Sequence, residues 1–597
     1  MRYVRPFAVA AMAIAIFVFT WFFRFNDPNG GFAGLTDDHF YYLLRGWQIL
    51  YGELPFRDFV DAGAPLYFYV SAAVQLLFGR GTLSELAFST TLIALGSALT
   101  FWLAARASGS VVFGLLGALF QILLLPRFYN YPKILVYTAA IPLLWWYADT
   151  AASAKVGSRS DPTGQRWLGG PRKRTAPARP IIWLAAVTVV GFLLRHDHVA
   201  FVGLAAVTTL LLAGHVPWRE RLRHGLLYAA LSLAMVTPYL VFIQLNGGLN
   251  EYRRQATEWA GEERARTPVQ WPGLFDNPDG VPEGAALERA VASVRSNRVA
   301  WLYYVEIALP ILALLVLGLS RDAFRPGWPH AIQKIALVSV LGLILDAGFL
   351  RSPLQARVAD PTVPHAILLA WLGIAVPRLL FARSSLRPAI EPWAVPVRVV
   401  AVLATISVVF MLGSIFTNRL SDRFEDAYLT EGPRVAIARA RTVSQNVLTD
   451  WDLSTWRNRP DRSGLMTLAL YLNTCTSPGS RVFIQPYLPQ VLGMARRGFA
   501  AGFGDLRPGF FDEPEFEALA MRRMRGQDVP VVLLDVGDSL ENFRESFPTL
   551  TAYFDAAYDT AATETFDDRF GVTLLVKRGR QGGTFDPLGW PCPAVPR

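Results

Sequence analysis

The sequence predicts a polytopic α-helical membrane protein that ends in a separate α/β domain, and three observations lead to this fold class. Only 17% of the 597 residues are charged and 52% are hydrophobic, whereas a soluble protein carries about 25% charged residues. Uncharged apolar runs that can cross a hydrocarbon core of ~30 Å recur up to Thr417. Beyond Thr417 these runs stop and short strand-like segments follow. A soluble nucleotide-binding enzyme, a disordered scaffold and a disulfide-rich secreted domain are therefore excluded.

About 11 transmembrane helices are expected within residues 1–417. The apolar segments that predict them are 6–23, 86–105, 107–126, 134–148, 180–194, 199–214, 225–243, 299–319, 335–350, 365–382 and 399–417. One further apolar segment, Pro65–Gly79, would form a helix of only about 22 Å. Because this is short for an upright span, we expect that segment to lie at the membrane interface or to re-enter the membrane.

The distribution of charge orients the chain. With eleven spans and a cytoplasmic N-terminus, the cytoplasmic segments hold 19 basic residues against 5 acidic ones, and the outer segments between spans hold 16 against 17. Lys and Arg are enriched in cytoplasmic loops. We therefore expect a multi-pass protein of the cytoplasmic (inner) membrane whose C-terminal domain is extracytoplasmic. The net charge of +10 then reports this orientation and contact with anionic membrane lipid, and no nucleic acid partner is expected.

Residues 418–597 are expected to form a soluble extracytoplasmic α/β domain. Its strand-like segments are Arg481–Gln485, Val529–Asp535 and Gly571–Lys577, separated by helical or turn-rich stretches. Both cysteines of the chain, Cys475 and Cys592, lie in this region. A disulfide and two free thiols are both compatible with their spacing.

Polar residues gather in four segments at predicted span ends, and the expected orientation places all four on the outer side. These segments are Thr36–His39, Arg127–Lys133, Arg195–His198 and Arg351–Arg357. The sequence has no P-loop, no GxGxxG after a strand, no CxxC and no HExxH. Because polar groups at a bilayer edge are unfavourable unless they face one another or a cavity, the four segments form the candidate functional site.

The acidic pair Asp37 and Asp38 has two interpretations. Both residues follow Thr36 at the start of an expected helix, on which Tyr41 and Arg45 continue the same face. Acidic residues in a first turn stabilise a helix by about 0.3–1 kcal/mol through its dipole, so the pair can be structural. Alternatively, one carboxylate is a general base that the other supports, because desolvation at a membrane surface raises a carboxyl pKa.

About residues 1–215 resemble the GT-C glycosyltransferases, which are membrane enzymes that use polyprenyl-phosphate sugars and include protein O-mannosyltransferases and lipid A aminoarabinose transferases. The resemblance rests on a long first outer loop, residues 24–85, that opens with the acidic pair. The loop continues through Gly52–Asp58 into a Pro-Leu-Tyr helix that ends in Leu-Phe-Gly. The chain departs from the aminoarabinose transferases at Gly63–Pro65, where those enzymes have Glu-Lys-Pro.

This resemblance implies a GT-C-like fold and an inverting glycosyltransferase. The enzyme would move a sugar from a polyprenyl-phosphate donor to an envelope glycan, lipid or protein on the outer face of the membrane. In the family, the first acid of the pair is the catalytic base, which falls on Asp37, with Asp38 as its neighbour. The acid often found in the second outer loop is replaced here by Asn130 and Lys133.

Four basic residues at predicted outer span ends suit a phosphate. Lys133, Arg195, Arg351 and Arg357 can stabilise the negative charge that the leaving polyprenyl phosphate gains in the transition state. The alternative for each residue is a cation that marks the membrane interface by snorkelling. Lys133 and Arg195 are the stronger phosphate candidates, because they lie in short loops among other polar groups.

The remaining polar candidates are assigned to the sugar or the acceptor. They are His39, Tyr41, Asn130, Tyr131, His196 and Asp197. Imidazole and carboxylate groups also suit a divalent metal, but substrate hydrogen bonds or local caps are favoured over a metal, and no cofactor is expected to be required. The competing function is a transporter or lipid flippase of envelope precursors, and a third is a non-catalytic subunit of envelope assembly.

Overall fold

The chain divides into two compact units in the computed structural model. The first consists of Met1–Asp27, Ser89–Pro238 and Thr267–Ala436, and the second of Pro28–Phe88, Tyr239–Arg266 and Ile437–Arg597. The structure describes residues 6–26, 35–61, 63–156, 178–211, 216–266, 271–274, 296–319, 330–349, 357–382, 394–413, 415, 420–453, 463–566, 570–586 and 588–594.

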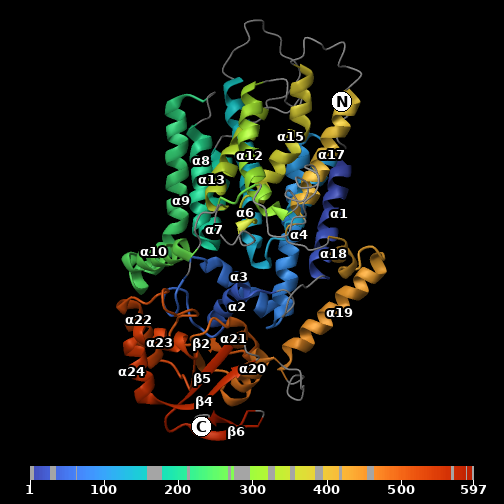
Figure 1. Cartoon of the computed structure of the whole chain (residues 1–597). Helices are drawn as coiled ribbons and strands as arrows, with labels where there is room; N and C mark the ends of the chain where they lie inside the picture. The colour runs from blue at the N-terminus through green and yellow to red at the C-terminus, as the bar shows by residue number, and fades with distance from the viewer. Residues whose placement is uncertain are drawn as a thin grey trace. The chain divides into compact units, whose positions relative to one another are not determined.

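The first unit is helical (Figure 1). Its elements are α1 (Pro6–Phe25), α5 (Val111–Leu123), the short 3-10 helix η2 (Phe128–Asn130), α6 (Tyr131–Val156), α7 (Ala178–Leu194), α8 (Asp197–Leu211), α12 (Arg298–Leu319), α13 (Ala331–Phe349), α15 (Thr362–Ala382), α17 (Ala394–Gly413) and α18 (Leu420–Asp426). Three helices have residues in both units: α4 (Thr82–Ser108), α9 (Trp218–Asn246) and α19 (Pro433–Trp451).

A helix is found at every one of the eleven apolar segments that the sequence singles out. Seven helices of the described chain, namely α1, α4, α9, α12, α13, α15 and α17, are long and apolar enough to cross a membrane. Helices α5, α7 and α8 are apolar but have 13, 17 and 15 residues. The prediction of a polytopic helical membrane protein is therefore confirmed, while the orientation of the termini stays a prediction.

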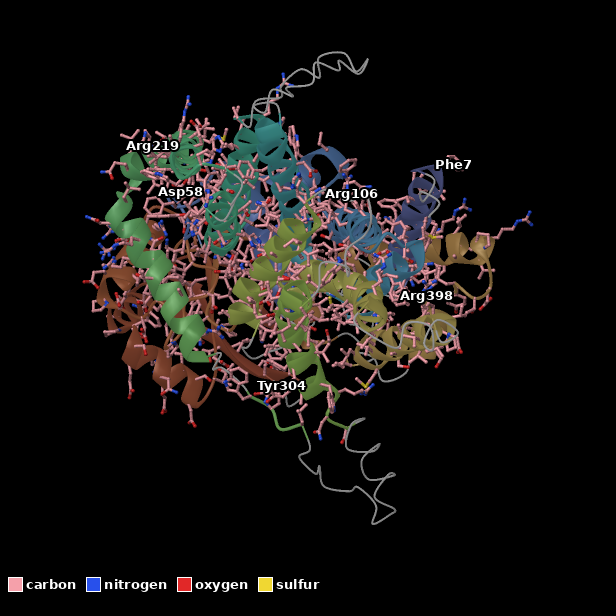
Figure 2. The ribbon with its side chains drawn as sticks, turned by 90° about the horizontal axis from the view of Figure 1, so that it is seen from above. Phe7, Asp58, Arg106, Arg219, Tyr304 and Arg398 are labelled. Carbon is pink, nitrogen blue, oxygen red and sulfur yellow. A yellow bond between two sulfur atoms is a disulfide. The ribbon has the colours of Figure 1, made fainter. Side chains whose placement is uncertain are left out.

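Small residues allow the membrane helices to pack closely. A Cβ atom on Gly117 of α5 would lie 2.7 Å from the carbonyl oxygen of Ala366 in α15, and one on Gly114 would lie 2.9 Å from the Cα of Ala105 in α4. Close backbone approach at glycine and alanine is the usual way in which helices associate in lipid. Apolar side chains with no such neighbours are exposed, as is Phe7 of α1, labelled in Figure 2, at 84%.

The second unit contains a mixed five-stranded sheet in the order β2-β1-β3-β5-β4. The strands are β1 (Arg481–Ile484), β2 (Gly498–Phe499), β3 (Val531–Leu534), β4 (Tyr558–Phe566) and β5 (Phe570–Lys577). Strand β1 pairs in parallel with β2 and β3, and β5 pairs antiparallel with β3 and β4. The predicted strands at 481–485, 529–535 and 571–577 are therefore confirmed, with small shifts at their ends.

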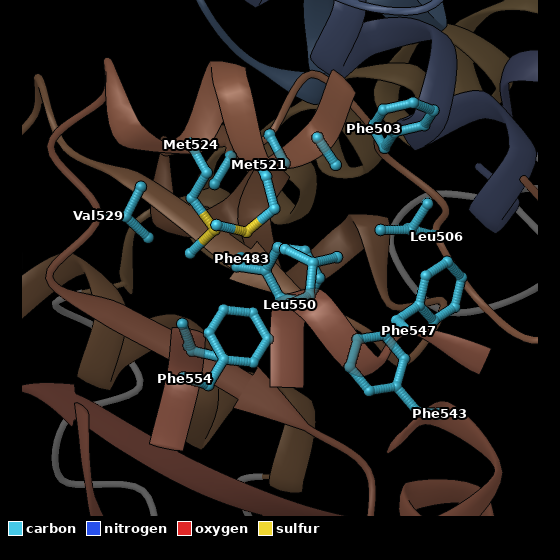
Figure 3. Close-up of a cluster of buried hydrophobic side chains, with 14 of the residues drawn as sticks. Phe483, Phe503, Leu506, Met521, Met524, Val529, Phe543, Phe547, Leu550 and Phe554 are labelled. Atoms are coloured by element: carbon cyan, nitrogen blue, oxygen red, sulfur yellow. The ribbon is translucent and has the colours of Figure 1, made fainter. Parts of the chain in front are cut away.

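Helices and a hairpin complete the C-terminal part of this unit. The helices are α20 (Gly464–Cys475), α21 (Pro489–Ala495), α22 (Pro514–Arg525), α23 (Asp538–Ser546) and α24 (Pro548–Ala557), and the hairpin strands are β6 (Gln581–Phe585) and β7 (Trp590–Pro593). Figure 3 shows the hydrophobic core, in which Met521 and Met524 of α22 point toward the ring of Phe483 in β1. A disulfide joins Cys475 and Cys592, which resolves the alternative that the sequence left open.

The same unit includes most of the predicted first outer loop, with α2 (Asp37–Leu50) and α3 (Pro65–Phe78), and the helix α10 (Leu249–Arg266). The Gln48 side chain of α2 donates to the Phe499 carbonyl at 3.1 Å, and Glu53 forms an ion pair with Arg481 at 2.7 Å. The backbone N–H of Val60 donates to the carbonyl of Gly502 at 2.9 Å. The segment that carries α2 and the C-terminal sheet thus fold together, although more than 400 residues separate Gln48 from its partner.

Candidate functional site

The acidic pair lies in the first turn of α2. Thr36 is the N-cap residue, with extended backbone, and its side chain makes no capping hydrogen bond to the helix. Asp37 is exposed and Asp38 is half-buried. The pKa of Asp37 is raised, first by partial burial of the carboxyl group and then by the adjacent negative charge of Asp38. A carboxylate of raised pKa that solvent can reach has the two properties that a general base needs.

Asp38 is held by a residue from the C-terminal part of the second unit. The hydroxyl of Tyr487 donates a hydrogen bond to Oδ1 of Asp38 at 3.2 Å. Tyr487 lies between β1 and α21, in the turn that carries the chain from the sheet into the helix. Burial, and then the charge of Asp38, raise the pKa of Tyr487 well above its usual range. The phenol therefore stays protonated and remains a donor to the carboxylate.

Arg45 and Arg507 each lie over the ring of a tyrosine in the second unit. The guanidinium of Arg45 lies over the ring of Tyr41 at 3.3 Å from its centroid, and it donates to the Tyr41 carbonyl at 3.3 Å. Burial raises the pKa of Tyr41 to about 12, against the opposing charge of Arg45. Asp505 forms an ion pair with Arg507 at 3.1 Å, and the Arg507 guanidinium lies 5.4 Å from the Tyr487 ring centroid. Tyr41 is buried, so its contact with a sugar stays a prediction.

His39 faces into the protein. Its Nε2 lies 3.2 Å from Oε1 of Glu85, in the first turn of α4, and its exposed fraction is 1%. Ser71 of α3 donates to the other oxygen of Glu85 at 2.9 Å. This buried group joins α2, α3 and α4. The structure therefore gives His39 a role in holding the acidic helix in place, and it does not bring His39 to a surface where a sugar could bind.

Asp61 positions the start of α3. Its Oδ1 accepts hydrogen bonds from the N–H groups of Gly63 at 2.9 Å and Ala64 at 3.0 Å. Its Oδ2 accepts a short hydrogen bond from the hydroxyl of Tyr239. Positive φ values make the turn before α3 possible, since Gly63 adopts φ 87°. The sequence GAP at this point thus forms a turn around a buried carboxylate.

Lys133 and Arg195, two predicted phosphate-binding residues of the first unit, form ion pairs with carboxylates. Lys133, in the first turn of α6, forms an ion pair with Asp360 at 2.8 Å, and both side chains are buried. Arg195 forms an ion pair with Asp197 at 2.8 Å where α7 ends and α8 begins. Arg195 and Asp197 also lie within electrostatic range of Lys133. The structure therefore brings three predicted residues together, and it adds Asp360, which the sequence did not single out.

Other candidates of this unit are placed as follows. The His196 ring stacks on Phe192 with centroids 4.6 Å apart, while the buried His198 accepts or donates a hydrogen bond at 2.9 Å to the hydroxyl of Tyr137. Asn130 and Tyr131 are buried where η2 meets α6. Arg357 is buried just before α15, and Arg351 lies outside the described residues.

Four residues near the predicted ones were not singled out from the sequence, and only one of them could have been found there. Asp360 is the one acid of the predicted outer segment 351–364, so a search for partners of Lys133 would have reached it. Tyr487, Asp505 and Arg507 gave no such signal, because they are far from α2 in sequence. No group of three or more His, Cys, Asp or Glu side chains in the described part of the chain is arranged to hold a metal ion.

Comparison with known proteins finds similar solved structures. No protein-family model and no curated protein sequence matches the chain. The crystal structure of ArnT from Cupriavidus metallidurans bound to undecaprenyl phosphate is similar over 96% of this chain and 98% of that one, with 11% identity and a TM-score of 0.47. The Archaeoglobus fulgidus oligosaccharyltransferase, tethered to an acceptor peptide, is similar over 94% of this chain and 74% of that one, with 11% identity and a TM-score of 0.42.

Proposed function

We propose that the chain is an inverting membrane glycosyltransferase that transfers a sugar from a polyprenyl-phosphate donor to a hydroxyl group of a cell-envelope acceptor. The observation that carries this proposal is the acidic pair, in which the solvent-accessible Asp37 has a raised pKa and Asp38 is held by Tyr487. The GT-C resemblance of residues 1–215 assigns the catalytic base to the same residue.

In the proposed reaction, Asp37 takes the proton of the acceptor hydroxyl as its oxygen attacks the anomeric carbon. The bond between that carbon and the phosphate oxygen breaks on the opposite side, and polyprenyl phosphate leaves with the bonding electrons. The configuration of the sugar is therefore inverted. Asp38 keeps a negative charge beside Asp37, which raises the affinity of Asp37 for the proton that it must accept.

Arg195 is the best candidate to bind the leaving phosphate. The Lys133 side chain is 3% exposed and already faces Asp360, whereas the Arg195 side chain is 29% exposed. A phosphate can compete with Asp197 for a partly exposed guanidinium, which binds phosphate oxygens in a bidentate manner. Lys133 then acts through its positive charge, and Arg351 and Arg357 remain proposed as further phosphate contacts. His196, Asp197, Asn130 and Tyr131 remain proposed for the sugar.

Transfer from a labelled polyprenyl-phosphate sugar by the purified chain tests the function. An Asp37→Asn variant removes the base and keeps the side-chain size, so we expect turnover to fall by about 10²–10⁴-fold. Asp58→Asn is the matched control, because Asp58 pairs with Arg57 in the same unit and no hydrogen bond or ion pair of the described residues joins it to Asp37 or Asp38. Full turnover by the Asp37 variant would remove Asp37 from the mechanism. Passage of the labelled lipid across vesicles without any glycosyl transfer would favour the transporter instead.

A further inference from the structure

Three ionisable side chains that the proposed reaction does not use meet inside the helical unit. Glu306 of α12 and Asp346 of α13 approach opposite nitrogens of His365 in α15. Nδ1 of His365 is in close contact with Oε2 of Glu306, and Nε2 lies 3.4 Å from Oδ1 of Asp346. The side chains of Glu306 and His365 are 0% exposed, and that of Asp346 is 6% exposed.

The helices around this cluster are apolar spans. Each of α12, α13 and α15 is long and apolar enough to cross a membrane, and Figure 1 shows them running side by side. Hydrogen bonds from other described residues do not reach the carboxylate oxygens of Glu306 or Asp346. Ionisable groups within membrane spans are rare because their charge is unfavourable there, and they mark functional positions when they occur.

A glycine of α13 and a proline of α12 lie near the cluster. A Cβ atom on Gly342 of α13 would lie 3.1 Å from Nε2 of His365, so the glycine allows a close approach of the ring to α13. Pro310 lies inside α12, four residues after Glu306. Proline has no N–H, so the helix hydrogen bond to the Glu306 carbonyl is missing at that turn. A buried polar cluster beside a carbonyl that lacks its usual helical donor is a built feature of these three helices.

In the part of the chain that the structure describes, no ion pair joins the cluster to another charged residue. Helices α5, α6, α8 and α17 pack against α12, α13 and α15. Their charged residues and those of the three helices, apart from the cluster, are Lys133, Asp149, Lys155, Asp197, Arg298, Lys334, Arg378 and Arg398; α8 also carries His198, and α5 has no ionisable residue. Lys133 pairs with Asp360 and Lys334 with Asp149. Arg298 and Arg378 lie eight and thirteen residues along their helices from Glu306 and His365, about 12 and 20 Å.

The number of protons that makes the cluster electrically neutral follows from the charges of its three groups. Without added protons the three groups carry two negative charges, and with a proton on His365 they still carry one. The cluster is neutral only when it holds two protons. These can occupy both carboxyls, or His365 and either carboxyl. In each of the three neutral arrangements at least one carboxyl is protonated, which avoids an uncompensated charge in the low-dielectric interior.

We propose that Glu306, Asp346 and His365 form a proton-binding site within the membrane helices, which holds two protons and joins α12, α13 and α15. The site lies three residues into α15, beside the chain segment that carries Asp360 and hence the ion pair with Lys133. Loss of both protons leaves two like-charged carboxylates on either side of a neutral imidazole, and their repulsion weakens the contact between the helices at this point.

Infrared spectroscopy of the full chain in nanodiscs tests the site directly. We expect the carbonyl stretching band of a protonated carboxyl group at neutral pH, with a slow shift in D2O because the group is buried. The double variant Glu306→Gln/Asp346→Asn, whose amides imitate neutral carboxyls in size, should fold and lack this band. Asp149→Asn is the matched control, since Asp149 pairs with Lys334 elsewhere in the unit, and it should keep the band.

Thermal unfolding gives an independent readout. The folded chain holds protons that the unfolded chain releases near neutral pH, so its stability relative to the double variant should fall as the pH rises. An absent carboxyl band in the wild type, or an unfolding temperature whose pH dependence is the same in both proteins, would overturn the proposal. So would stabilisation by added Zn²⁺ that a chelator reverses and that the double variant lacks, because it would identify a metal instead of protons.

Discussion

At the residue scale, the acidic pair receives a hydrogen bond from a phenol contributed from far along the chain. The Tyr487 hydroxyl fixes the orientation of Asp38, and Asp38 raises the pKa of Asp37. Asp37 reaches solvent while Asp38 is half-buried, so the two carboxylates have different tasks. The first can accept a proton and the second sets the electrostatic environment in which it does so.

Replacing Tyr487 by phenylalanine removes this hydroxyl and little else. A hydrogen bond to a charged group contributes about 1.5–3 kcal/mol, so we expect kcat/KM for sugar transfer to fall by about tenfold or more. Tyr51→Phe is the control, because the Tyr51 hydroxyl donates to the Arg496 carbonyl at 3.0 Å without touching the pair. Equal activity in the two variants would show that Tyr487 does not position Asp38.

The raised pKa of Asp37 also sets the pH dependence. A base acts only when ionised, so the acid limb of the kcat/KM profile should lie above the usual Asp range of about 4. Burial is the larger cause and the Asp38 charge the second. Asp38→Asn should therefore move the acid limb to lower pH, but not to its usual position. An acid limb that stays in place in this variant would contradict the coupling of the two carboxyls.

The sequence predicted some residues of the candidate site and could not predict others. Asp37 was singled out because two adjacent acids at a helix start are visible locally. The ion pair of Lys133 with Asp360 required two helices to meet, and the tyrosine partner of Asp38 required a fold that joins residues 449 positions apart. Local pattern reveals which residues carry chemistry, whereas the identity of their partners depends on tertiary packing.

At the element scale, the lengths of the apolar runs predicted the helices. The pattern of buried and exposed residues along a strand explains why some strands were predicted and β4 was not. Strands β1 and β3 are buried throughout, and β5 is buried except at its ends, so they appear in the sequence as short apolar runs. Strand β4 has a largely exposed face and a bulge between Thr560 and Ala562, and its sequence YDTAATETF carries no apolar run. An edge strand of this kind is determined by its pairing with β5 and not by its own residues.

Close helix packing yields a prediction about Gly117. An alanine there would place a methyl group 2.7 Å from the backbone oxygen of Ala366, which cannot move aside as a side chain can. We expect Gly117→Ala to lower stability by about 1–3 kcal/mol, measured as a lower unfolding temperature in detergent. Gly225→Ala in α9 is the control, since no atom lies within 4 Å of its added Cβ. Equal unfolding temperatures for both variants would show that α5 and α15 do not pack as described.

At the scale of the whole molecule, the disulfide closes the C-terminal part of the chain on itself. Cys475 at the end of α20 pairs with Cys592 in β7, across 117 residues. Cross-links that close long loops stabilise a fold by about 2–4 kcal/mol, and they persist in oxidising compartments. This bond is therefore compatible with the extracytoplasmic location that the charge distribution predicts for residues 418–597.

Reduction should destabilise this part of the chain. We expect Cys592→Ser to lower the unfolding temperature of the purified protein and to speed proteolysis of its C-terminal region. The double variant Cys475→Ser/Cys592→Ser should behave like the single one, because either change breaks the same bond. If a thiol-specific maleimide labels the denatured wild-type protein without prior reduction, the disulfide does not form in the cell.

Because α2 contacts the C-terminal sheet, Asp38 can meet its tyrosine partner only late in the synthesis of the chain. Asp38 leaves the ribosome 449 residues before Tyr487. At translation rates of about 5–20 residues per second, this corresponds to roughly 20–90 seconds. Throughout that interval the helix that carries the pair lacks its tyrosine, its Phe499 contact and its ion pair from Glu53 to Arg481. A nascent or truncated chain therefore presents the acids without the groups that orient them, and the complete pair forms only in a nearly full-length product.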